Sequence, residues 1–147
     1  MAQTFSTELA GINSLPVVKP AVPAYGGRLR RYRATIVNAS QASGDTIVLA
    51  KIPVGQVFAF GLITSTASLG GTATIAIGVS GATGLYRAAA TFTAVETPTL
   101  FGAGTLVTAD MASVAGFAAE QTVIATIAAA SLPGTGTWVV DIYTSQG

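Results

Sequence analysis

A cluster of arginines is the part of this sequence whose residue types and spacing most clearly suggest chemistry. Arg28, Arg30, Arg31 and Arg33 fall within six positions, with Tyr32 among them. Guanidinium groups pair with carboxylates or phosphates through two parallel hydrogen bonds. The cluster therefore has three interpretations: a nucleic-acid patch, solvated side chains at the end of a strand, or arginines that dock on the carboxylates of a protein partner.

A nucleic-acid partner is the interpretation that the whole chain supports least. Basic patches that bind nucleic acid usually belong to domains with an isoelectric point above about 9, whereas this chain has one near 8.1. The cluster is also short and stands alone. We therefore expect no nucleic acid among the partners, and the other two interpretations stay open.

The residues that most often perform catalysis or hold metals are missing. The sequence has no histidine and no cysteine, so the commonest general base and the usual transition-metal ligands are absent. The carboxylates are too scattered to suggest a glycosidase pair or a calcium loop; they are Glu8, Asp45, Glu96, Asp110, Glu120 and Asp141.

Two other catalytic or ligand-binding patterns also fail. The glycine-rich stretches 70–72 and 81–84 do not continue into the lysine and helix of a phosphate loop. A Ser–Lys dyad through Lys19 or Lys51 has no motif to support it. We therefore predict no catalytic residue, no cofactor and no metal site, and we expect the protein not to be an enzyme.

The composition is typical of strands and turns. Charged residues make up 9% of the 147 residues, against about 25% in ordinary soluble domains. Net charge is +1, but residues 1–51 carry six basic and two acidic side chains (+4), whereas residues 52–147 carry one and four (−3). Such an asymmetry can join copies head to tail or hold the basic end on an acidic surface.

The stretch 46–79 contains three expected strands, over 47–52, 57–65 and 73–79, and the chain has no charge between residues 52 and 86. A run of this kind requires that both faces of its sheet be covered, by the protein's own core or by a partner. Alternation of large and small side chains predicts which residues are buried. They are Ile47, Leu49, Phe58, Phe60, Ile75, Ile77, Trp138, Val140 and Ile142.

Further strands are expected on either side. The first covers 28–37, and a last pair covers 122–130 and 137–144. We expect one helical turn over 85–90, a short strand over 91–95 and a buried corner at 100–102, whereas 105–108 is weakly strand-like and 109–117 is ambiguous. About eight short strands with regular turns predict an all-β fold, an antiparallel β-sandwich or jelly roll.

The first 27 residues are expected to form an extended arm ahead of a β-sandwich domain at 28–147. Three prolines within eight residues favour an extended path, and Pro16, Val17 and Val18 lie in a segment more apolar than a solvated tail requires. A disordered tail is the alternative.

The N-terminus has neither a basic region nor a continuous apolar run, so we expect no secretory signal. The uncharged runs are broken by Gly, Pro, Ser and Thr, so we also expect no membrane partner.

Three segments carry a resemblance to a known class of proteins. They are TIVLAKIPVG (46–55), GTATIAIG (71–78) and YRAAATFT (86–93). With these segments, residues 28–147 resemble small virion structural proteins of tailed bacteriophages. The resemblance implies a head decoration, or cement, protein, which is a β-sandwich on the outer surface of the capsid, with no catalytic residues.

From that resemblance we expect the major capsid protein and further copies of the chain as partners. The chain would be made in the host cytoplasm and act on the outer capsid surface of the virion. We place attachment on Pro16, Val17, Val18, Arg28, Arg30, Arg31 and Arg33. A tail, baseplate or receptor-binding component, or a lectin-like binding module, remains an alternative.

We predict that the isolated protein forms a homo-oligomer, with a trimer slightly favoured over a dimer. The charge-free span and a set of small-residue faces suggest exposed apolar surface, which is rare on monomers; the small residues are Ala73, Ala76, Gly78 and Ala88 to Ala90. Sedimentation equilibrium at micromolar concentration measures the mass directly. A mass near 14.7 kDa would contradict the prediction for the free protein.

Overall fold

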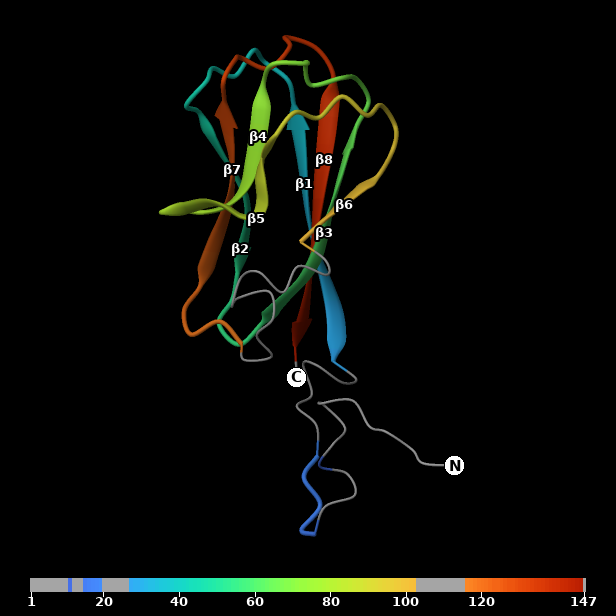
Figure 1. Cartoon of the computed structure of the whole chain (residues 1–147), viewed down its shortest axis with the longest axis vertical. Coiled ribbons are helices and arrows are strands. Elements are labelled where there is room, and N and C mark those ends of the chain that lie inside the picture. Colours follow the sequence, from blue (N-terminus) through green and yellow to red (C-terminus); the bar gives the residue numbers. More distant parts are fainter. Residues whose placement is uncertain (1–10, 12–14, 20–26, 103–115, 147) are drawn as a thin grey trace.

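The chain folds into two facing antiparallel β-sheets (Figure 1). The computed structural model describes residues 11, 15–19, 27–102 and 116–146. Their strands are β1 (Arg28–Val37), β2 (Thr46–Ile52), β3 (Val57–Ser65), β4 (Thr74–Val79), β5 (Ala82–Ala90), β6 (Thr99–Phe101), β7 (Gln121–Ala128) and β8 (Thr137–Gln146).

The strand order identifies the sandwich as a jelly roll. One sheet has the order β1-β8-β3-β6 and the other β2-β7-β4-β5. Strand pairs β1·β8, β2·β7, β3·β6 and β4·β5 are all antiparallel. The chain is thus one long hairpin rolled over itself, which is the jelly-roll arrangement. The all-β sandwich expected from the sequence is confirmed, and β1 begins at Arg28 as expected, whereas a separate arm over 1–27 stays a prediction.

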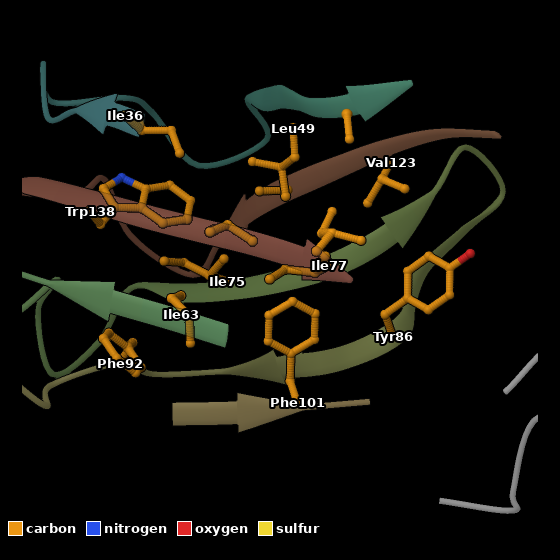
Figure 2. Close-up of a cluster of buried hydrophobic side chains, with 14 of the residues drawn as sticks. Ile36, Leu49, Ile63, Ile75, Ile77, Tyr86, Phe92, Phe101, Val123 and Trp138 are labelled. Carbon is orange, nitrogen blue, oxygen red and sulfur yellow. The ribbon is translucent and has the colours of Figure 1, made fainter. Parts of the chain in front are cut away.

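The core lies between the sheets (Figure 2) and is built from alternate residues of the strands. Trp138 and Val140 of β8 and Ile75 and Ile77 of β4 are fully buried. Phe58 stacks on Tyr86, with ring centroids 4.1 Å apart, so it joins β3 to the opposite sheet. Burial is confirmed for most of the predicted set: Leu49, Phe58, Ile75, Ile77, Trp138, Val140 and Ile142.

The prediction was wrong for Phe60 because β3 contains a bulge. Ala59 and Phe60 together oppose Tyr143, and the register shifts between Phe58 and Phe60. An extra residue reverses the alternation beyond it, so Phe60 turns to the outer face, where it is only partly buried. Ile47 is also only partly buried, at the edge of the core.

Two local predictions in the middle of the chain were also wrong. Residues 85–90 form part of β5, not a helical turn, because pairing with β4 outweighs the helix preference of alanine and leucine. Residues 91–95 are not a strand. Phe92 is nevertheless buried, and its carbonyl accepts a hydrogen bond from Leu69 N–H at 2.9 Å, which fixes this connection on the sandwich.

The corner at 100–102 and the last two strands were also expected from the sequence. The expected corner at 100–102 includes the end of β6, where Phe101 is buried and Leu100 is exposed. The last two strands exist, but β7 and β8 lie in different sheets and do not pair with each other. Their connection crosses from one sheet to the other, as a jelly roll requires.

The charge-free span is covered mainly within the chain. Ala73 and Ala76 are buried, and the backbone of Ala82 and Thr83 crosses directly over Gly78, where a Cβ atom would overlap it. These residues therefore do not form the exposed patch that motivated the predicted oligomer. Only the exposed run 88–90 of that set is available to a partner, so the oligomer stays a prediction with less surface to support it.

The expectations for residues 105–108 and for most of 109–117 lie outside the described residues. No helix among the described residues has both the length and the apolar character needed to cross a membrane.

Replacement of Ile77 tests the core. Ile77→Asp places a carboxylate in the apolar core between the sheets, and we expect it to lower the free energy of unfolding by about 3 kcal/mol or more. Val48→Asp is the matched control, because Val48 is 59% exposed on β2 of the same sheet, and its effect should stay within about 0.5 kcal/mol. Urea denaturation measures both. If Ile77→Asp unfolds like the parent, Ile77 is not in the core.

Candidate protein-interaction surface

The arginine cluster lies on β1, at the edge of its sheet. In the register of β1 with β8, Arg28 lies opposite Gln146 and Arg33 opposite Asp141. Successive side chains of a strand point to opposite faces. Arg28 and Arg30 therefore share the face of Tyr32, which turns toward the opposite sheet, whereas Arg31 and Arg33 lie on the outer face.

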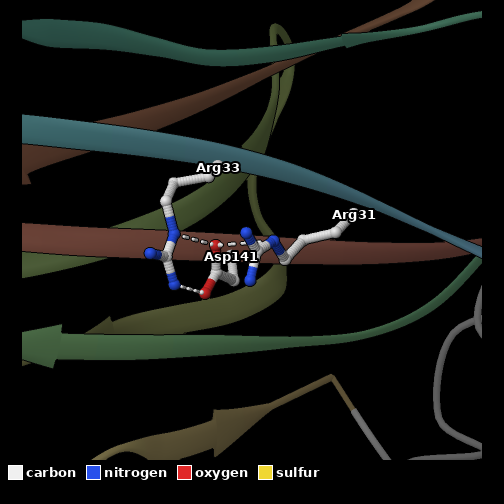
Figure 3. A network of polar contacts seen from close by, with 3 residues as sticks. All are labelled: Arg31, Arg33 and Asp141. Atoms are coloured by element: carbon white, nitrogen blue, oxygen red, sulfur yellow. Dashed lines mark hydrogen bonds and ion pairs between the residues drawn. The ribbon is translucent and has the colours of Figure 1, made fainter.

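Arg33 and Asp141 form a bidentate ion pair on the outer face (Figure 3). Arg33 Nε donates to Asp141 Oδ1 at 2.8 Å, and its second nitrogen donates to Oδ2 at 2.6 Å. Arg31 Nε lies 3.9 Å from the same carboxylate. Asp141 is only 6% exposed, because β8 runs between β1 and β3 and the two arginine side chains cover it.

The ion pair shifts the pKa values of both side chains in opposite directions. The hydrogen bond from Arg33 lowers the pKa of the Asp141 carboxyl, desolvation by burial opposes this, and the charges of Arg33 and Arg31 lower it further. The same hydrogen bond raises the pKa of Arg33. Asp141 is therefore ionised at neutral pH and pairs with Arg33, whereas Arg31, at 3.9 Å, makes only a distant contact with the same carboxylate.

The structure thus divides the predicted attachment arginines into two groups. Arg33 has a partner within the chain, and Arg31 has a distant one. Arg28 and Arg30 are exposed and form no ion pair with any described residue. The sequence-based reasoning missed Asp141, since the two partners are 108 positions apart and only the pairing of β1 with β8 joins them.

An apolar area lies on the same outer face. The Phe60 and Tyr143 rings stack with centroids 4.6 Å apart, and Tyr143 lies opposite Arg31 in the strand register. Leu29 and Val37 on β1 are 61% and 68% exposed. The outer face of this sheet therefore combines arginines with exposed aliphatic and aromatic surface, a combination found at protein interfaces.

On the inner face of β1, two residues beyond Arg30, Tyr32 contacts a buried polar cluster. Tyr32 donates its hydroxyl hydrogen to Gln56 Oε1 at 2.8 Å, and Thr144 donates to the same oxygen. Gln56 and Thr144 are buried. These contacts fix the first half of β1 and the end of β8 at the same end of the sandwich (Figure 1).

The predicted attachment residues of the arm are described only in part. Pro16, Val17 and Val18 are exposed, and Val18 N–H donates to Gly11 carbonyl at 3.0 Å. Their role in attachment stays a prediction. The described residues contain no group of three or more side chains suited to hold a metal ion.

Comparison with known proteins gives a shared fold. No protein-family model matches the chain, and no curated protein matches it in sequence. A chain of the cyanophage Pam1 capsid asymmetric unit superposes with a TM-score of 0.63 and 15% identity, covering 84% of this chain and 88% of that one. A chain of the Ralstonia phage GP4 capsid gives 0.59 and 20% identity, covering 82% and 84%.

A third solved structure has the same likeness. A chain from the acid-stable capsid of Helicobacter pylori bacteriophage KHP30 has a TM-score of 0.57 and 11% identity, and the match covers 80% of this chain and 86% of that one. At these identities the comparison establishes the fold alone. All three matches extend over most of both chains, so the resemblance is of whole molecules and not of a shared motif.

Neutralising Asp141 should make stability less dependent on pH. The folded-state pKa of Asp141 is lowered, so its stabilising contribution is present above the unfolded pKa of about 3.9 and is lost as pH falls through the lower folded value. Asp141→Asn should lower the unfolding temperature by roughly 2–4 °C at neutral pH, and this difference from the parent should shrink in acid.

Thermal unfolding between about pH 7 and pH 2.5 measures this effect by circular dichroism. Glu120→Gln is a suitable control, because Glu120 is exposed and forms no ion pair with a described residue. A constant difference between parent and Asp141→Asn at all pH values would show that the ionised carboxylate does not stabilise the fold.

Proposed function

We propose that this chain is a non-enzymatic structural protein of a tailed-phage virion, and that it decorates the head. In this role it binds the outer surface of the assembled capsid as a cement protein, with the major capsid protein as its partner. The observation that carries the proposal is the jelly roll itself, whose whole-chain likeness is to chains in three phage capsid structures.

The coverage of these matches supports an accessory role. Each matched chain is covered over more than four fifths of its length by this small jelly roll, so each is itself mainly one such sandwich. A small, rigid sandwich can bridge neighbouring shell subunits and add contact area where internal DNA pressure separates them. A protein that binds only the assembled shell stabilises that state by mass action.

The exposed arginines give this role a chemical basis. Arg28 and Arg30 have no ion-pair partner among the described residues, and Arg31 has only a distant one. Carboxylates on a shell protein would complete these pairs, and the nearby apolar outer face supplies area that is removed from water on binding.

The position of Trp138 argues against a lectin-like function. Jelly rolls occur in lectins, and sugar sites in proteins use exposed aromatic faces. Trp138 is the only tryptophan and is fully buried. Phe60 and Tyr143 each have one ring face covered by their mutual stacking, which reduces the aromatic surface on which a sugar could lie.

Binding to undecorated heads tests the proposal. The parent should bind heads that lack it, and co-sedimentation measures the affinity. Removal of residues 2–24 should leave the sandwich folded and weaken binding at least tenfold, about 1.4 kcal/mol. Arg28→Ser with Arg30→Ser should slow association and reduce its sensitivity to salt, without disturbing Asp141.

The single variants Arg28→Ser and Arg30→Ser have Lys51→Ser as their charge-matched control, because Lys51 is exposed on β2 of the other sheet. It should bind heads at the parental rate. Failure of the parent to bind undecorated heads at all would contradict the proposed function. Parental binding by the deletion and the arginine variants would instead move attachment to another surface, such as the loop 69–72.

A further inference from the structure

The first half of β1 has an open backbone edge. Among the described residues, β1 is the last strand of its sheet and has β8 as its only neighbour there. Asn38 N–H donates to Gly136 carbonyl at 2.9 Å, in line with the β1·β8 register, and antiparallel ladders bond alternate residues. The even-numbered residues of β1 therefore bond β8.

The odd-numbered residues of β1 consequently direct their N–H and C=O groups away from the sheet. Two other hydrogen bonds agree with this alternation of backbone groups between β8 and the open edge. Val37 carbonyl accepts a hydrogen bond from the Gln41 side chain at 3.1 Å, and Thr137 carbonyl turns toward β3, where Thr66 N–H binds it at 2.9 Å. Among the described residues, nothing bonds the outward backbone groups of Leu29, Arg31 and Arg33.

The arginines of this half-strand lie on both of its faces. Arg28 and Arg30 are on one face and Arg31 and Arg33 on the other, since strand side chains alternate. A strand added beside β1 alternates in the same way, so its side chains would lie next to both pairs. Carboxylates at consecutive positions of such a strand would meet an arginine on each face.

From this geometry we propose that the edge of β1 over residues 28–33 receives an extended acidic segment of another polypeptide as an added strand. Main-chain hydrogen bonds to Leu29, Arg31 and Arg33 hold the segment, and Arg28, Arg30 and Arg31 select for its carboxylates. The inference rests on the proposed function only for the source of the segment, which would be a neighbouring virion protein.

Other occupants fit this edge less well. Nucleic acid presents its phosphates to one surface, whereas the arginines are split between two faces and Arg33 already holds Asp141. A second copy of β1 would bring the same arginines to the junction, and like charges across strands are destabilising. An acidic extended segment satisfies both the backbone groups and the charges.

A designed peptide tests strand addition independently of any capsid. The probe is acetyl-Val-Glu-Asp-Val-Glu-Asp-Val-amide, which places carboxylates on both faces of a strand. At about 1 mM peptide, amide exchange followed by NMR should slow at least tenfold at Leu29, Arg31 and Arg33. The control peptide replaces all three valines with proline, which keeps the charge and removes N–H groups on both edges of the strand, and it should give no such protection.

Proline substitutions test the same edge on the virion. Leu29→Pro removes an outward N–H without removing a β8 hydrogen bond, and it should weaken binding to undecorated heads at least tenfold. Val37→Pro is the matched control, because Val37 has similar exposure and also an outward N–H, but lies at the end of β1 that Gln41 caps. Val37→Pro should bind like the parent.

The outcomes separate this inference from the proposed function. If the parent does not bind heads, the proposed function fails and the peptide experiment alone decides the edge. Equal protection by the proline peptide, no protection by either peptide, or stronger protection of the same amides by a single-stranded DNA oligonucleotide would each overturn strand addition. Parental binding of heads by Leu29→Pro would overturn it on the virion.

Discussion

The pairing of β1 with β8 is the interaction on which the rest of this structure depends. It joins the beginning of the sandwich to its end across the full length of both strands, and it allows β8 to pair on its other side with β3. Without it, no β1 side chains would pack beside the core residues of β8, which are Trp138, Val140 and Ile142. Such long-range pairing is expensive in chain entropy, and the buried inner faces of the two sheets offset that expense.

The same pairing organises the candidate surface. It places Arg33 opposite Asp141, so one charge of the cluster is used to hold β1 on β8. It also leaves β1 as an edge, with its remaining arginines exposed. An edge strand is a hazard when it can pair with any other chain, and charged side chains limit that pairing. On β1 the charges restrict the choice of partner while the backbone remains open.

Much of the fold was predictable because its signals are local. Alternation in β4 and β8 is regular, and it identified Ile75, Ile77, Trp138 and Val140 as core residues. The errors lie where contacts between residues far apart in the sequence determine the local conformation. The bulge that turns Phe60 outward exists only against Tyr143, and the alanines of β5 extend because β4 lies beside them.

The candidate site shows the same division. The arginine cluster is visible in the sequence, and its split between two faces follows from strand periodicity. Its ion pair with Asp141 and the direction of its free backbone groups follow only from topology, since they depend on which strand lies beside β1. The role of Pro16, Val17 and Val18 in attachment stays a prediction.

Cryo-electron microscopy of undecorated heads mixed with the full-length protein tests the central claim most directly. The account predicts jelly-roll density on the outer surface of the shell, repeated over the head, with the arginine-bearing half of β1 against a shell subunit. Heads that remain bare, or density confined to the tail, would contradict it.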